Sequence, residues 1–156
     1  LTFDETRITD GLKWQLSKLK EFDFALKRQN IFIVGDCSTG KTSLASTIGI
    51  KALEKGAKVI YITLDDLLVE SKIKKKVWNN ILNADLVIID DVFYIAPTEE
   101  ELVLIYKILM FLQETRSIIL VTNRPLSSWK EMKCDSHLME TLQKRLMQDA
   151  QIISLA

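Results

Sequence analysis

The residues with the clearest chemical meaning form a glycine-bounded loop in the first third of the chain. Residues 35–42 read GDCSTGKT, which fits the pattern G-x-x-x-x-G-K-[ST]. Glycine permits a tight turn whose successive backbone N–H groups point at a phosphate, and a helix starting at Lys41 would present its N-terminus to the same anion. A chance glycine-rich turn is the alternative. It is disfavoured because an apolar run precedes the loop and a helical pattern follows it, as the motif requires.

The side chains of this loop have separate predicted tasks. Lys41 can reach the β- and γ-phosphates of a nucleotide, and the Thr42 hydroxyl can ligate Mg²⁺. The predicted ligands are therefore ATP and Mg²⁺. The residues expected to bind them are Gly35, Asp36, Cys37, Ser38, Thr39, Gly40, Lys41, Thr42 and Ser43.

A pair of acids follows an apolar run further along the chain. Residues 86–91 read LVIIDD, which is typical of a buried strand that ends beside a phosphate-binding loop. We expect Asp90 to hold Mg²⁺ through water, which makes Thr42 and Asp90 the metal site, and Asp91 to orient or deprotonate the attacking water. The alternative is an ordinary buried strand followed by a turn or capping acid.

A polar residue also ends the apolar run at residues 118–122. Asn123 stands at the tip of this expected strand, where an amide can hydrogen-bond a γ-phosphate or the attacking water. An ordinary turn asparagine before Arg124 and Pro125 is the alternative interpretation. We predict a catalytic role for Asn123 beside Lys41 and the two acids.

A local basic cluster is the only sequence feature that suggests nucleic acid. Its members are Lys72, Lys74, Lys75 and Lys76, and Trp78 follows them. Lysines beside an aromatic ring can bind a phosphate backbone and stack a base, so single-stranded DNA is a predicted partner. A solvated lysine face is an equally good interpretation.

The elements that must position these residues alternate between strands and helices. Short apolar runs predict strands at 31–34, 59–63, 85–90, 118–122 and 151–155. Helical patterns cover an opening segment with Leu12, Leu16 and Leu19, and then 41–55, 66–76, 77–82, 98–114 and 136–148. Expected helix-start signals are Asp65, the Thr98–Glu101 capping box and Ser128 with Glu131, while Gly56 suits the position after a helix end. This alternation predicts an α/β fold whose parallel sheet is covered on both faces.

Composition is consistent with a single domain over residues 1–156. The chain is 47% hydrophobic, carries 21 basic and 21 acidic residues, and has no apolar run of the roughly 18 residues that span a bilayer. Two cysteines, Cys37 and Cys134, give no disulfide framework, so we expect a reduced, cytoplasmic protein without membrane contact. Because the first residue is Leu1, we expect a core that lacks an N-terminal partner-binding segment.

Together these segments resemble the DnaC/IstB-like group of AAA+ ATPases. The resemblance runs from about Asn30 to the end and rests on residues 30–42, 64–68 and 84–92. Its most specific part is VTNRPLSSW at 121–129, which is similar to the family's T-N-x-P-x-S-x-W pattern. The segment LQKRL at 142–146, followed by an apolar strand, resembles the family's arginine-bearing segment.

The resemblance implies a P-loop NTPase fold with a five-stranded parallel sheet in the order 5-1-4-3-2 and no C-terminal lid. It implies ATP bound at subunit junctions in a self-oligomer, with Arg145 acting catalytically in trans. It also implies contacts to single-stranded DNA from the lysine cluster. The favoured function is that of a replicative helicase loader, whose partner is a ring helicase, and the alternative is an IstB-like helper of a transposase.

Some residues depart from the family pattern. Asp91 stands where glutamate is usual, so its carboxylate is one methylene shorter and hydrolysis is expected to be slow. Asp36 and Cys37 occupy loop positions where prolines are common. Asp91 keeps open an ATP-gated adaptor that does not hydrolyse ATP. A P-loop nucleotide or small-molecule kinase also remains open, because such enzymes share the phosphate-binding loop and the parallel sheet.

Overall fold

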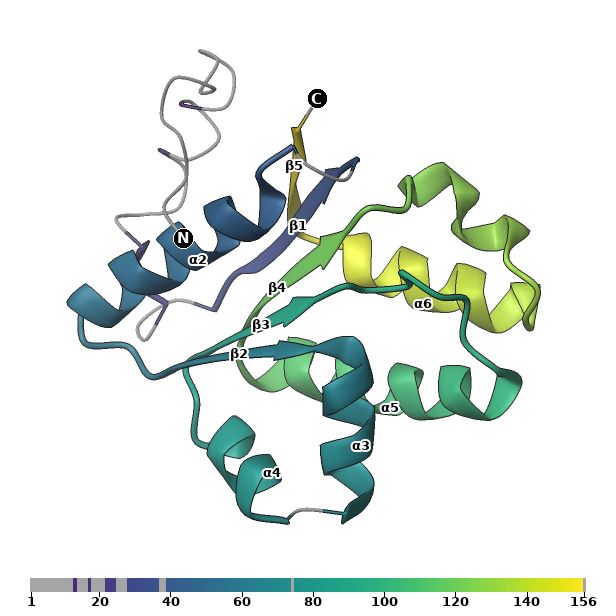
Figure 1. Ribbon diagram of the computed structural model, residues 1–156, viewed down its shortest axis with the longest axis horizontal. Helices are drawn as coiled ribbons and strands as arrows, with labels where there is room; N and C mark the ends of the chain where they lie inside the picture. The colour runs from purple at the N-terminus through teal and green to yellow at the C-terminus, as the bar shows by residue number, and fades with distance from the viewer. Residues whose placement is uncertain are drawn as a thin grey trace.

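The chain folds around a single five-stranded sheet in the computed structural model (Figure 1). The structure describes residues 13, 17, 22–24, 28–36, 39–73 and 75–155. The strands are β1 (Asn30–Gly35), β2 (Val59–Thr63), β3 (Leu86–Asp90), β4 (Ser117–Thr122) and β5 (Ala150–Leu155). Their spatial order is β2-β3-β4-β1-β5 and every neighbouring pair is parallel, which confirms the predicted order 5-1-4-3-2.

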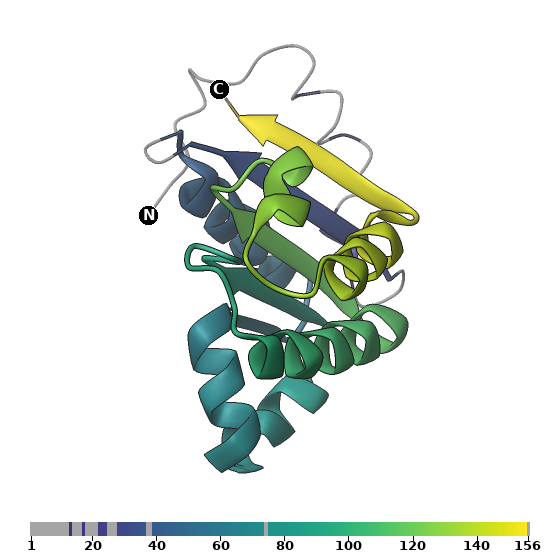
Figure 2. The same cartoon turned by 90° about the vertical axis from the view of Figure 1, so that its right-hand side faces the viewer.

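Helices cover both faces of the sheet, as expected when parallel strands are joined by crossovers (Figure 2). The elements are α2 (Lys41–Glu54), α3 (Leu64–Ile73), α4 (Lys75–Leu82), α5 (Glu99–Thr115), the 3-10 segment η3 (Leu126–Glu131) and α6 (Ser136–Met147). The opening helix predicted around Leu12, Leu16 and Leu19 lies outside the described residues. No described helix combines the length and the apolar content that a membrane crossing requires.

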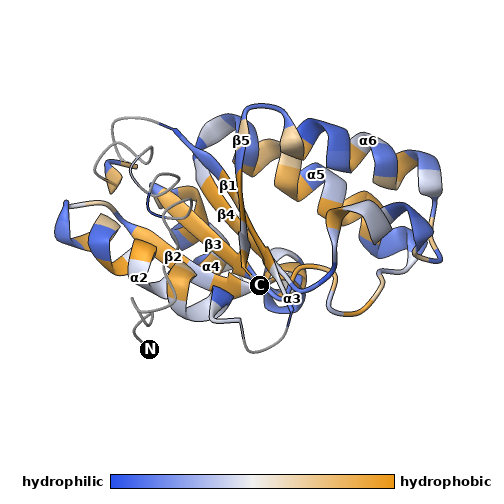
Figure 3. Cartoon of the chain, turned by 90° about the horizontal axis from the view of Figure 1, so that it is seen from above, coloured by the Kyte–Doolittle hydropathy of each residue, from blue (hydrophilic) through white to orange (hydrophobic). Residues whose placement is uncertain are grey.

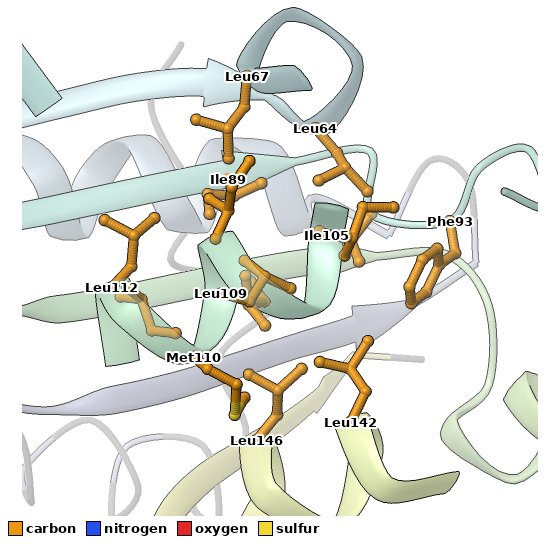
Figure 4. Packing of buried hydrophobic residues seen from close by; sticks show 14 of the residues in the cluster. Leu64, Leu67, Ile89, Phe93, Ile105, Leu109, Met110, Leu112, Leu142 and Leu146 are labelled. Carbon is orange, nitrogen blue, oxygen red and sulfur yellow. The ribbon is translucent and has the colours of Figure 1, made fainter. Parts of the chain in front are cut away.

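Alternate residues of each strand belong to different halves of the core. On β3, Leu86 and Ile88 pack toward α2, whereas Val87 and Ile89 pack toward α3, α5 and α6. This period of two is the reason that the inner strands β3 and β4 are apolar over most of their length, and the hydropathy colouring of Figure 3 shows them as orange bands. Figure 4 shows the larger half, where leucines of α3, α5 and α6 meet Ile89 and Phe93.

The predicted helix ends are partly correct. Thr98 and Glu101 form the expected capping box at the start of α5, with Oγ1 of Thr98 accepting from the Glu101 N–H at 3.1 Å. Gly56 follows the end of α2 with φ 90°, as a residue after a helix end requires.

Two other predicted caps are wrong. Asp65 does not precede α3 but lies in its first turn, because β2 runs directly into the helix; the Thr63 hydroxyl accepts the Asp66 N–H at 3.2 Å instead. Ser128 does not cap a helix either, because η3 begins at Leu126 and no side chain caps it. The Ser128 hydroxyl donates to the Pro125 carbonyl at 2.8 Å.

Trp129 fixes the loop that follows β4 to the core. Its side chain is 0% exposed, and its ring packs edge-on to Phe93 at 4.8 Å and tilted against Phe32 at 5.9 Å between centroids. The indole N–H donates to the Arg124 carbonyl at 3.3 Å, so the buried polar atom has a partner. One side chain therefore joins β1, the segment after β3 and the segment after β4.

Replacing this ring tests its contribution to the core. For Trp129→Ala we expect the free energy of unfolding to fall by about 3–5 kcal/mol, because the substitution removes apolar burial and leaves a cavity. Denaturant unfolding followed by circular dichroism measures the change. Tyr94→Ala is the control, because Tyr94 is 62% exposed and its loss should change stability by less than about 0.5 kcal/mol. Equal losses in the two variants would contradict the assignment of Trp129 as a core anchor.

Candidate functional site

The predicted chemical residues gather at the carboxyl edge of the sheet. β1 ends at Gly35, β3 at Asp90 and β4 at Thr122, and β4 lies between the other two strands. In open parallel sheets, ligands bind outside the carboxyl ends of the strands. The phosphate-binding loop, the acid pair and Asn123 therefore begin from three adjacent strand ends.

The loop after β1 is shaped for close approach of a ligand to its backbone. Gly40 adopts a left-handed conformation (φ 87°, ψ 15°) immediately before α2, and no side chain caps that helix. The first N–H groups of α2 are thus presented to the space above the loop, where an anion would be stabilised. Cys37 and Ser38, which were predicted to bind the nucleotide, lie outside the described residues.

Two side chains of the loop fold back onto its backbone. The Thr39 hydroxyl donates to the Asp36 carbonyl at 2.8 Å, and the Lys41 ammonium donates to the same oxygen at 3.3 Å. Gly35 has no room for a side chain, because an added Cβ would lie 2.6 Å from Oγ1 of Thr39 and 2.8 Å from the carbonyl oxygen of Leu155. The hydrogen bond from Lys41 to Asp36 therefore holds the Lys41 ammonium against the phosphate-binding loop, where Lys41 is predicted to contact the nucleotide.

The Asp90 carboxylate is the best-coordinated group of the site. It is only 6% exposed, and its Oδ2 accepts from the Thr42 hydroxyl at 3.1 Å and from the Tyr61 hydroxyl. Its Oδ1 accepts from the backbone N–H of Asp91 at 2.8 Å. The structure thus brings together Thr42 and Asp90, the two residues predicted to hold Mg²⁺.

This donor set fits magnesium in its usual protein environment. Mg²⁺ prefers oxygen ligands and is commonly held by one or two protein oxygens together with nucleotide phosphates and water. The described part of the chain contains no cluster of three or more His, Cys, Asp or Glu side chains able to hold a metal alone. A cation at this position would therefore depend on the nucleotide as well as on Thr42 and Asp90.

Asp91 differs from Asp90 in environment and in backbone. Its side chain is exposed and its backbone is left-handed (φ 53°), as is that of Phe93 (φ 56°). Desolvation and the neighbouring charge of Asp90 raise the pKa of the Asp91 carboxyl, while Lys41 opposes the shift. A raised carboxyl pKa beside a lysine suits a group that accepts a proton from water.

Tyr61 belongs to the site although no sequence pattern singled it out. Burial of its hydroxyl, and then the hydrogen bond and negative charge of Asp90, raise the pKa of the Tyr61 phenol well above its usual range. The phenol therefore remains a neutral donor. Only its position relative to Asp90 could have identified Tyr61. β2 lies beside β3 with Thr63 opposite Asp90, and this pairing becomes known only with the fold.

The strand end that carries Asn123 is joined to the segment after Asp90. The Thr122 hydroxyl donates to the Val92 carbonyl at 2.7 Å, and the Val92 N–H donates to the Val121 carbonyl at 2.9 Å. The Arg124 side chain donates from Nε to the Phe93 carbonyl at 3.0 Å. Asn123 is therefore fixed at the edge where β4 passes between the loop and the acids, while its catalytic role stays a prediction.

Arg145 is the predicted site residue that the fold places elsewhere. It lies in the last turn of α6, just before β5, and β5 begins opposite Asn30 at the amino end of β1 (Figure 1). The six-residue strand β1 spans about 17–20 Å, and it separates this end from the phosphate-binding loop. The exposed guanidinium lies 5.9 Å from the centre of the Tyr106 ring, and the Arg145 carbonyl accepts from Gln113.

The lysine cluster lies at the far end of the α3–α4 pair, away from the sheet (Figure 1). Lys72 and Lys76 are exposed, whereas Lys74 lies outside the described residues. Trp78 is half-buried and packs partly against the core. Lys72 and Lys76 therefore carry exposed charge, and the DNA contact itself stays a prediction.

Comparison with known proteins agrees with this geometry. Residues 2–156 match the family model described as IstB-like ATP binding protein. An ATP-binding protein of an IS21-like insertion sequence from Bacteroides fragilis is 31% identical over 147 residues, covering 90% of this chain and 56% of that protein. The ATP-binding protein of insertion sequence IS21 from Pseudomonas aeruginosa is 27% identical, covering 85% of this chain and 52% of that protein. The chain thus spans about half the length of these curated relatives.

Solved structures share the fold at low sequence identity. The DnaC helicase loader has a TM-score of 0.75 at 18% identity, covering 100% of this chain and 94% of that one. DnaA from Aquifex aeolicus bound to AMPPCP has a TM-score of 0.71 at 23% identity, covering 95% of this chain and 47% of that one. The five-stranded order is therefore that of the P-loop AAA+ fold. With the family match over residues 2–156 and the loop, acid pair and strand order described above, the chain belongs to the IstB-like ATP-binding proteins.

Proposed function

We propose that this chain is an ATP-hydrolysing AAA+ module that acts on DNA as the helper of a transposase. The observation that carries the ATP-dependent part is the contact between the Thr42 hydroxyl and the buried Asp90 carboxylate. This contact joins the start of the phosphate-binding helix to the acid pair, as a magnesium–nucleotide site requires.

Each side chain at this edge has a defined proposed task. Lys41 binds the β- and γ-phosphates, and the Thr42 hydroxyl and Asp90 hold Mg²⁺, which neutralises phosphate charge when bound. Asp91 orients the attacking water and accepts its proton, with its raised pKa as support. Asn123 contacts the γ-phosphate or the same water from the neighbouring strand end.

Arg145 is proposed to act on the nucleotide of a second copy of the chain. It is exposed and lies at the amino end of the sheet, whereas the phosphate-binding loop lies at the carboxyl end. An arginine so placed does not serve its own site but is available to a neighbour in a head-to-tail assembly. Each complete site would then need two protomers.

The names of the sequence relatives support the choice of a transposase as the proposed partner. The matched relatives are ATP-binding proteins of insertion sequences, which favours a transposase over the ring helicase expected from the resemblance alone. The likeness to the DnaC helicase loader concerns the fold. Co-purification of the full-length protein with the transposase of its own insertion sequence, or with the replicative helicase, distinguishes the two partners. The kinase alternative gains no support from this family.

The tight space at Gly35 gives a testable prediction about ATP binding. For Gly35→Ala we expect ATP affinity to fall by about tenfold or more, equivalent to about 1.4 kcal/mol, because the new methyl displaces Thr39 or the β5 backbone. Isothermal titration calorimetry with Mg-ATP measures the change. Gly56→Ala is the matched control: it has free space and φ 90°, so it should cost about 1–2 kcal/mol of stability and leave ATP affinity unchanged. Normal ATP binding by Gly35→Ala would contradict the proposed loop.

A mixing experiment tests the action of Arg145 on a neighbouring site. Lys41→Ala should not bind ATP, and Arg145→Ala should bind ATP but lose about 10³-fold in kcat. Mixed in equal amounts, the two inactive variants should regain ATPase activity, because roughly a quarter of randomly formed junctions in a head-to-tail assembly pair an intact loop with an intact arginine. Lys144→Ala, a change of the exposed neighbouring residue, should remain fully active. A mixture that stays inactive, or an active Arg145→Ala protein, rules out this role.

The DNA contact is tested through its salt dependence. For the double variant Lys72→Ala/Lys76→Ala we expect weaker binding to single-stranded DNA and a log affinity–log salt slope reduced by about 1.4, or 0.7 for each lost phosphate contact. Fluorescence anisotropy at several salt concentrations measures both. Lys55→Ala/Lys58→Ala removes the same charge from exposed residues between α2 and β2 and should leave the slope unchanged. The same slope change in both double variants would show a general charge effect instead.

A further inference from the structure

Tyr61 reaches the magnesium site from the edge strand of the sheet. It pairs with Ile88 on β3, and Asp90 lies two residues further along that strand. Side chains two residues apart on a strand share a face, so Ile88 and Asp90 both point toward α2. The long phenol side chain extends along this face, and its hydroxyl donates to Oδ2 of Asp90.

The hydroxyls of Tyr61 and Thr42 share one carboxylate oxygen. Oδ2 of Asp90 accepts from both, while Oδ1 accepts from the backbone of Asp91. A carboxylate with donors on both oxygens has one favoured orientation. Groups that hydrogen-bond a metal-binding side chain in this way fix its direction and commonly affect metal affinity.

The Tyr61 side chain also lies beside residues of α2 and β3. It lines an apolar groove with Ile50 and Leu53 of α2 and with Ile88, and the residue as a whole is 42% exposed. The substitution Tyr61→Phe therefore removes the hydroxyl and keeps an aromatic ring in this groove. This substitution makes the hydroxyl testable by a change of a single atom.

We propose that Tyr61 is a positioning residue for the magnesium site, whose hydroxyl holds the Asp90 carboxylate in the orientation that receives the cation. This inference rests on the proposed function, because the orientation matters only when a magnesium–nucleotide complex binds. The contact that the structure shows for the Tyr61 hydroxyl is to the Asp90 carboxylate. Tyr61 acts through Asp90.

The test compares nucleotide binding with and without the cation, using a fluorescent ATP analogue and the full chain. For Tyr61→Phe we expect the affinity measured in EDTA to match the wild type within about twofold, because the phosphate-binding loop is unchanged. At saturating analogue, the Mg²⁺ concentration that gives half of the maximal fluorescence response should rise by about tenfold. This is the lower end of the usual range for removing a residue that hydrogen-bonds a metal ligand. An unchanged or lower Mg²⁺ midpoint overturns the inference.

Two further variants and the wild type show whether a negative result concerns the ring, the hydroxyl or the proposed function. Tyr61→Leu also removes the ring, so it should show the same rise in the Mg²⁺ midpoint and a lower melting temperature; a rise in this variant alone would assign the effect to ring packing and overturn the proposal. Tyr94→Phe removes a hydroxyl from an exposed residue and should match the wild type. Wild-type protein that binds the analogue without any response to Mg²⁺ would instead contradict the proposed function.

Discussion

Everything at the carboxyl edge depends on one buried negative charge. A carboxylate that loses water must recover its hydrogen bonds from the protein, because an unpartnered buried charge costs several kcal/mol. Asp90 recovers them from three separate elements: Thr42 at the start of α2, Tyr61 on β2 and the backbone after β3. Satisfying this one group therefore fixes the phosphate-binding helix, the edge strand and the acid pair relative to one another.

The sheet order separates the two halves of the proposed chemistry. With β4 inserted between β1 and β3, the loop, Asn123 and the acids come from adjacent strand ends, and the hydrogen bonds from Thr122 and Arg124 join the end of β4 to the segment after Asp90. Because β5 is also parallel to β1, the chain returns to the amino end of the sheet before β5 begins, and Arg145 lies at that end. Under the proposed function, a site divided in this way would link nucleotide chemistry to association between subunits, as in a protein that switches with its bound nucleotide.

The sequence allowed the sheet order, the loop and the Thr42–Asp90 pair to be predicted, because local motifs and the family resemblance place them. The Thr98 capping box is equally local and was also correct. The errors at Asp65 and Ser128 arose where a strand passes into a helix without a loop and where a 3-10 segment replaces a helical turn. Tyr61 was missed for a different reason: its contact spans two strands, and only the register of β2 against β3 reveals it.

The left-handed backbone at Asp91 limits which residues natural variation can place there. Aspartate and asparagine enter this region of conformational space readily, whereas most other side chains pay about 1–2 kcal/mol. Phe93 bears a similar cost, offset by its packing on Trp129. The short aspartate side chain therefore suits the left-handed backbone at position 91. A glutamate at position 91 would move the carboxylate one methylene further out but would be less favourable in this left-handed backbone, so the reach of the acid and the conformation of the chain oppose each other at this position.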